Sequence, residues 1–396
     1  MGSPARRGAQ ALAAAGASVA IALAACADRG SEPVGAAPSL ELFGAQATAV
    51  GDELWVFGGV AGPDGSSPPV TSRMPPGWGP NLRVTAYSPD GEVVRLVTLP
   101  IDGRRSLVGG RVLRTSGVVY LLSSTCDGGF GCGGVADPLL LRFDGERVEE
   151  VRLDLPRADY GTQVGGGLLT VLGHTGSTAW ALQRVADPSG TAYVPPQRLL
   201  AIELTNGRAT EVALPPGLYG TEVLCLGEGQ LFAAQADLDD RVNLTAVRIL
   251  RRHAGVEASV WEEMSEQPID RGFVGAGGLL CLEDHAELVV WLDGFPTVVT
   301  TLSMTTGAAT AAHATPSNSA GLELLGVVEG DAVLGSRTDD GARILWRHRP
   351  GSWEQIANTN PPRPSRLIVL DGRLYDVSGV LRRSDPDRGE LVPLDL

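Results

Sequence analysis

Short apolar runs separated by glycine turns recur along the chain from residue 40 onward. Each copy joins an apolar run, a turn that contains glycine and an alternating run, as in residues 86–100 (AYSPDGEVVRLVTLP). Runs of about 4 to 8 apolar residues bounded by turn residues are typical of β-strands, and no long amphipathic helical pattern accompanies them. We therefore expect an all-β protein. The seven copies lie at residues 86–100, 141–156, 202–215, 250–264, 302–316, 346–362 and 382–396.

A second pattern, a pair of strands around a small turn, precedes each of these copies. The two patterns together make seven four-stranded units, and four-stranded units that repeat every 40 to 50 residues or so are typical of a β-propeller. We predict one seven-bladed β-propeller over residues 40–396. The last unit ends after three strands, and we expect residues 39–50 to supply its missing inner strand and close the ring. The strand pairs lie at residues 51–59, 116–124, 166–174, 228–236, 277–285, 329–337 and 371–379.

The first unit carries a recognisable local motif. Residues 55–59 (WVFGG) resemble the hydrophobic run and double glycine of a kelch repeat, and Tyr87, Trp346 and Trp353 fit the aromatic position that follows. The other units lack the double glycine. The resemblance implies a fold like the central domain of galactose oxidase, but the tyrosine–cysteine–histidine set of that copper site has no counterpart here. We expect no metal and no cofactor.

The N-terminus has the layout of an export signal. Arg6 and Arg7 precede an apolar segment at residues 9–22, which is followed by Leu23-Ala24-Ala25-Cys26. This order is that of a secretory signal peptide, here residues 1–25. The ending resembles the lipobox of bacterial lipoproteins, which implies cleavage before Cys26 and a diacylglycerol group on its thiol. An ordinary signal peptide with a chance cysteine is the alternative, and the choice between Sec and twin-arginine export stays open.

A lipid on Cys26 would hold the protein at the outer, extracytoplasmic face of the cell membrane. Residues 26–39 are small, polar and proline-bearing, and we interpret them as a flexible tether.

Composition narrows the function classes further. Acidic residues outnumber basic ones by 46 to 32, which gives a net charge of −14 and argues against nucleic-acid binding. All basic residues are arginine, so a lysine nucleophile is excluded. In an exported chain the cysteines can oxidise. We predict a Cys126–Cys132 disulfide; Cys225 and Cys281 form either a second bridge or two buried free thiols.

Three long insertions mark a candidate binding face. Residues 61–80, 125–138 and 185–196 fall between the second and third strands of the first three units. Long loops on a rigid scaffold commonly carry binding sites, and Trp78 and Tyr193 are aromatic residues within them. The links between units on the same face carry further polar and aromatic residues, which either ring the central channel or cap strands: Arg104, Arg105, Arg157, Tyr160 and Tyr219.

These features favour a non-catalytic, monomeric protein that binds a protein or a glycan at the cell envelope. No catalytic residues are predicted, because the five histidines are scattered over different units and a strand would send the polar residues of 281–285 (CLEDH) to alternate faces. The alternative function is an envelope glycan-acting hydrolase or lyase. Such an enzyme needs ionisable groups from several blades that converge at the mouth of the channel.

Overall fold

The computed structural model describes the regular core of the propeller and leaves out the N-terminal residues and many links. The described residues are 46–58, 60–61, 79–80, 82–101, 105–127, 135–144, 147–156, 166–185, 197–215, 224–238, 244–254, 260–292, 298–314, 320–328, 330–337, 343–359, 367–370, 373–376, 382–385 and 390–393. Their regular elements are all β-strands, so the all-β prediction is confirmed. Within this part of the chain, no helix has the length and apolar character needed to cross a membrane.

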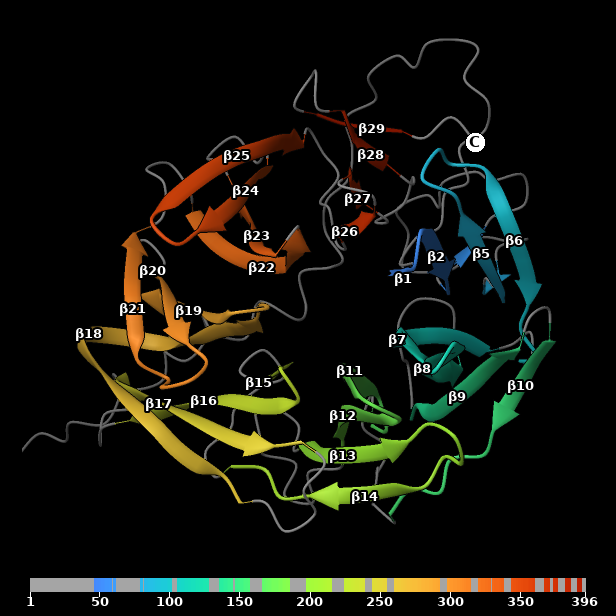
Figure 1. The fold of residues 1–396 in the computed structure, drawn as a ribbon, viewed down its shortest axis with the longest axis horizontal. Helices are drawn as coiled ribbons and strands as arrows, with labels where there is room; N and C mark the ends of the chain where they lie inside the picture. Colours follow the sequence, from blue (N-terminus) through green and yellow to red (C-terminus); the bar gives the residue numbers. More distant parts are fainter. Residues whose placement is uncertain are drawn as a thin grey trace, which may run out of the picture.

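The strands are arranged in a ring of antiparallel sheets, which is a β-propeller (Figure 1). The first three sheets have four strands each. They contain β1 Gln46–Val50, β2 Glu53–Phe57, β5 Arg83–Tyr87 and β6 Val93–Thr98; β7 Arg105–Thr115, β8 Val118–Asp127, β9 Asp137–Asp144 and β10 Arg147–Val151; and β11 Leu169–Thr175, β12 Thr178–Arg184, β13 Gln197–Glu203 and β14 Ala209–Val212. The short strands β3 Val60–Ala61 and β4 Gly79–Pro80 pair within the first insertion.

The next two predicted units are joined into one seven-stranded sheet. Its strands are β15 Leu224–Gly227, β16 Gln230–Leu238, β17 Leu244–His253, β18 Glu262–Cys281, β19 His285–Leu292, β20 Val298–Ser303 and β21 Ala309–Ala314. β18 is 20 residues long. Its first part pairs with β17 and its last part pairs with β19, because the residues between them stay extended instead of turning.

The last part of the ring contains two four-stranded groups. They are β22 Ala320–Val328, β23 Asp331–Arg337, β24 Arg343–Arg349 and β25 Ser352–Thr359; and β26 Leu367–Leu370, β27 Arg373–Asp376, β28 Arg382–Asp385 and β29 Glu390–Pro393. A single parallel bridge, Asn358 to Glu390, connects the two groups. The described residues therefore form six blades, and the prediction of seven separate blades is wrong because β18 merges two of the predicted units.

The predicted closure of the ring is also wrong. β1 pairs with β2 in the first blade, from Gln46 opposite Phe57 to Val50 opposite Glu53, so residues 46–50 do not complete the last blade. The last blade instead contains four strands of its own C-terminal segment, β26–β29. It meets the first blade through contact between β26 and β1, and the Tyr375 hydroxyl donates a hydrogen bond to the Pro89 carbonyl at 2.7 Å.

The core lies between neighbouring blades, which explains the apolar middle strands. Residues 179–182 of β12 are all buried, because this strand packs against another sheet on each of its faces. The outermost strands β6, β10 and β14 are mostly exposed or half-buried. Between the first two blades, Trp55 packs edge-on against Phe143 with the ring centroids 5.3 Å apart. Similar packing between sheets recurs around the ring. Within the seven-stranded sheet, β15–β17 pack against β19 and β20, and in the last part of the ring β22–β25 pack against β27.

Candidate functional site

The three long insertions connect equivalent strands of three consecutive blades. They join β2 to β5, β8 to β9, and β12 to β13, which in each case are the second and third strands of the blade. Since the three blades share one strand order and follow one another around the ring, these links leave from the same face. The position predicted for the insertions is confirmed at their described ends.

Arg105 is the predicted face residue that the structure describes. It begins β7 and forms an ion pair with Asp137, which begins β9. Arg105 lies opposite Asp127 at the end of β8, so the pair spans the edge from which the second insertion leaves. The Thr125 hydroxyl also donates a hydrogen bond to the Asp137 carbonyl at 3.4 Å. An ion pair of this exposure contributes about 1 kcal/mol or less to stability, so its main effect is to hold the first residues of β7 and β9 in position relative to each other.

The remaining predicted residues of the face and of the export signal lie outside the described residues. They are Trp78, Arg104, Arg157, Tyr160, Tyr193 and Tyr219 of the face, and Leu23, Ala24, Ala25 and Cys26 of the signal. Cys126 is buried and disulfide-bonded. Its predicted partner, Cys132, also lies outside the described residues, so this pairing stays a prediction.

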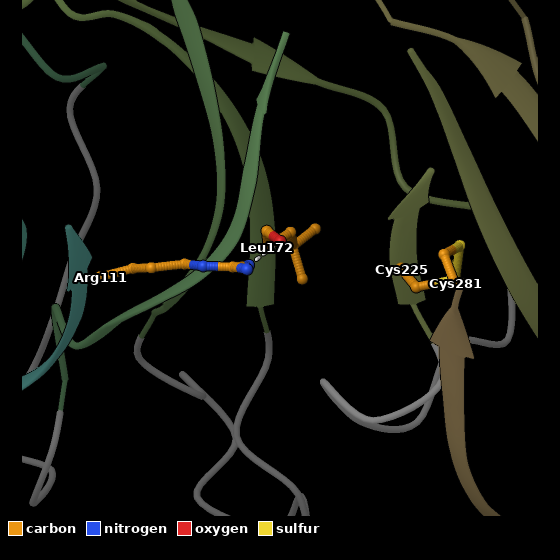
Figure 2. The surroundings of a disulfide bond; sticks show 4 residues. All are labelled: Arg111, Leu172, Cys225 and Cys281. Carbon is orange, nitrogen blue, oxygen red and sulfur yellow. Dashed lines mark hydrogen bonds between the residues drawn. A yellow bond between two sulfur atoms is a disulfide. The ribbon is translucent and has the colours of Figure 1, made fainter. Parts of the chain in front are cut away.

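Of the two alternatives left open for Cys225 and Cys281, the structure contains the disulfide bridge. Cys225 in β15 and Cys281 at the end of β18 are bonded, with their Cα atoms 5.6 Å apart. The two strands are not neighbours in the hydrogen-bonded order of their sheet, yet they contact each other at its inner edge. Figure 2 shows the bond between these two strands. The disulfide therefore joins the innermost strands of two successive units.

The structure also reveals a buried group of carboxylate and imidazole side chains that the sequence did not predict. Glu287 of β19 is fully buried and accepts a hydrogen bond from the Thr301 hydroxyl at 3.0 Å. His285 Nε2 lies 3.1 Å from the same Glu287 oxygen, and His348 Nδ1 lies 3.3 Å from it. His348 belongs to β24 of the next blade and is also fully buried. We call Asp284, His285, Glu287 and His348 the interblade cluster.

One edge of the interblade cluster reaches the surface. The exposed carboxylate of Asp284 lies at hydrogen-bond distance from His285 Nδ1. This hydrogen bond lowers the pKa of the Asp284 carboxyl below its usual value. The other side of the cluster is closed, because the His348 ring lies 4.4 Å from the Trp353 ring and neither Glu287 nor His348 is exposed.

The chemistry of the interblade cluster is therefore structural. A substrate cannot reach Glu287 between the two sheets, so this cluster does not supply the open site that the hydrolase alternative requires. Among the described residues, no group of three or more histidine, cysteine or acidic side chains is arranged to hold a metal ion.

Part of the interblade cluster could have been predicted from the sequence. His285 and Glu287 are two residues apart in a strand, so they share one face of it. The group noted in the sequence, residues 281–285, ends before Glu287, so Glu287 was not predicted. His348 could not have been predicted in this way, because it comes from another blade.

Comparisons with known proteins support the fold and leave the family open. No known protein family matches the chain, and no curated protein matches it. Solved structures of peptidases are similar in fold. A prolyl endopeptidase superimposes with a TM-score of 0.52 at 12% identity, over 90% of this chain and 50% of that one. A puromycin-hydrolyzing peptidase of Mycobacterium tuberculosis gives 0.50 at 13%, over 91% and 54%. A Pyrococcus horikoshii acylaminoacyl peptidase gives 0.53 at 8%, over 89% and 52%.

These matches have a limited meaning. The chain spans about half the length of the peptidases that it resembles. At such low identity the similarity shows the β-propeller fold alone, and one fold serves many functions. The kelch and lipoprotein resemblances of the sequence stay predictions.

Proposed function

We propose that the chain is an envelope lipoprotein, anchored at the outer face of the cell membrane through Cys26, whose propeller binds a protein or glycan partner without catalysis. The observation that carries the proposal is the position of the three long insertions. Residues 61–80, 125–138 and 185–196 connect the second and third strands of three adjacent blades, so the strand ends that carry them share one face of the ring. A rigid ring that presents long loops side by side is a typical binding scaffold.

The described edge of this sector supports the proposal. The Arg105–Asp137 ion pair and the Cys126 disulfide both stiffen the blade edge beside the second insertion. Holding loop ends in place reduces the entropy lost when the loops contact a partner, which favours binding. The long insertions follow equivalent strands, so a single partner would contact all three blades.

The alternative function is an envelope hydrolase or lyase with its site at the mouth of the channel. Several solved structures with a similar fold are peptidases, which fits this alternative loosely. The interblade cluster does not add to it, because Glu287 and His348 are enclosed between sheets.

Crosslinking and co-purification from intact cells test the proposal. We compare the native protein with a variant in which residues 61–80 are replaced by a short glycine–serine turn. A matched control replaces residues 239–243, which also link a second strand to a third, with a glycine–serine turn of equal length. We expect one partner to be captured by the native protein and the control, and lost from the 61–80 variant.

Two results would contradict the binding proposal. One is an identical capture pattern for all three proteins. The other is release of defined fragments from isolated envelope glycan by the native protein and not by heat-denatured protein, which would establish the hydrolase alternative. Circular dichroism of each variant confirms that its propeller is folded.

A further inference from the structure

The innermost described strands of the propeller contain more arginine than acidic residues, although the chain as a whole is acidic. The chain carries a net charge of −14. The strands that contact one another around the centre of the ring are β1, β7, β11, β15, β18, β22 and β26. We count β18 from Phe273, where its pairing with β19 begins. These strands contain three arginines, Arg105, Arg111 and Arg114, and one acidic residue, Glu323. A positive wall enclosed by protein attracts anions more strongly than the same charges on an open surface.

Arg111 lies midway along this wall. Its side chain is exposed to solvent, and partial desolvation by the surrounding protein lowers the pKa of its guanidinium. Its Nη1 donates a hydrogen bond to the Leu172 carbonyl of β11 at 2.7 Å (Figure 2). Within the described part of the chain, no acidic side chain pairs with Arg111, whereas Arg105 pairs with Asp137 and Arg198 pairs with Glu211.

Irregular backbone on both strands places the Arg111 guanidinium. Gly109 and Gly110 form a bulge in β7, where the pairing with β8 shifts between Val108 and Arg111. Gly110 has φ of +102°, and a Cβ atom there would lie 2.7 Å from the Leu122 carbonyl oxygen, so only glycine fits. β11 shifts its register at Leu172, the residue whose carbonyl accepts the hydrogen bond. Bulges of this kind commonly re-aim a side chain beside a functional site.

We propose that Arg111 is the centre of an anion-binding site on the inner wall of the propeller, and that it binds the carboxylate or phosphate group of a small ligand. One guanidinium donor is held by Leu172, which leaves the planar fork oriented with further donors for an oxyanion. Arg114 of the same strand adds positive charge, whereas Arg105 is already paired with Asp137. The site is separate from the insertion face, so it does not depend on partner binding by the loops.

Isothermal titration with inorganic phosphate and with acetate, at fixed pH and at constant ionic strength set with chloride, tests the site. Three proteins are compared: wild type, Arg111→Gln and the control Arg147→Gln, which alters an exposed arginine of the outer strand β10 in the same blade. We expect saturable binding of one anion to wild type and to the control. Binding to Arg111→Gln should be about tenfold weaker or more, since a charge-assisted hydrogen bond is lost.

The choice of anion identifies the ligand class, because preference for phosphate indicates a phosphorylated ligand and preference for acetate a carboxylate. Saturable binding that Arg111→Gln retains, or no saturable binding of either anion to wild type, would overturn the site. Arg111→Lys keeps the charge without the planar fork, so it should fold and bind with intermediate affinity even if Arg111→Gln does not fold. Capture of a partner through the insertion face should be unchanged in either variant.

Discussion

At the scale of single residues, the most constrained part of the described structure is the interblade cluster. The Glu287 carboxylate has no contact with water and is surrounded by one hydroxyl, from Thr301, and by two imidazole rings, from His285 and His348. Removing a carboxylate from water is costly unless partners replace the lost hydration. The arrangement is stable only when the sheets that carry β19 and β24 dock in one register, so the cluster specifies how these two sheets meet.

Replacing Glu287 tests this role. We expect Glu287→Ala to lower the free energy of unfolding by about 3 kcal/mol, because the His285 and His348 rings lose the carboxylate that lies within 3.3 Å of both. Urea unfolding followed by tryptophan fluorescence measures the change. Glu283→Ala, in the exposed turn beside the cluster, is the control and should change stability by about 0.5 kcal/mol or less. Equal effects of the two substitutions would show that the cluster contributes nothing specific.

At the scale of elements, most strands are short and pair with the next strand along the chain. Most of these strand pairs are joined by a tight turn. Turn residues such as Gly207 and Gly307 have positive φ angles, +72° and +68°, which several turn types require. β15 and the end of β18 are innermost strands that share no backbone ladder. The Cys225–Cys281 disulfide links these two strands covalently at a place where no backbone hydrogen bonds connect them.

Removing this disulfide should destabilise the seven-stranded sheet. The two cysteines are 56 residues apart, and closing a loop of this length corresponds to about 4 kcal/mol in the chain-entropy model. We expect the double variant Cys225→Ser, Cys281→Ser to unfold at correspondingly lower urea concentration under non-reducing conditions, which leave the Cys126 disulfide intact. Hydrogen exchange should increase most in β15 and in the last part of β18. Unchanged stability and unchanged hydrogen exchange would show that the disulfide does not stabilise the contact between β15 and β18.

At the scale of the whole molecule, the ring closes by contact between blades instead of by exchange of a strand. β1 stays in the first blade and β26–β29 form the last one, so the junction depends on side-chain packing and on the hydrogen bond from Tyr375 to Pro89. Tyr375 is fully buried at this junction. A ring closed in this way has a seam at which opening costs less than within a continuous sheet.

Removing the Tyr375 hydroxyl group tests how the seam between the first and last blades is held closed. We expect Tyr375→Phe to lower the free energy of unfolding by about 1 kcal/mol, because the hydrogen bond from the Tyr375 hydroxyl to the half-buried Pro89 carbonyl is lost. Exchange of backbone amides in β1 and β26 should rise with it. Tyr120→Phe removes a buried tyrosine hydroxyl inside the second blade and serves as the control. Equal exchange at the seam in both variants would show that the hydrogen bond does not hold the ring closed.

The sequence predicted the features that depend on neighbouring residues. Strand–turn–strand pairs such as residues 51–59, the glycine turns and the positions of the long insertions were predicted, and the described structure bears them out. For Cys225 and Cys281 the sequence left a bridge and two free thiols open, and the structure contains the bridge. The Arg111 site was not predicted, because the sequence does not show that β7 and β11 are neighbours and that Arg111 therefore contacts Leu172. The tether and the lipid on Cys26 stay predictions.

Local residue patterns were enough to predict the all-β character, the four-stranded repeat and the propeller, because alternation and turn chemistry act between residues only a few positions apart. Tertiary structure alone decided the number of blades, the way the ring closes, and which polar side chains meet. Glu287 and His348 come together from different blades, and so do Arg111 and the Leu172 carbonyl, which are 61 residues apart. Such contacts depend on how whole sheets pack against one another, and no local pattern of residues encodes that packing.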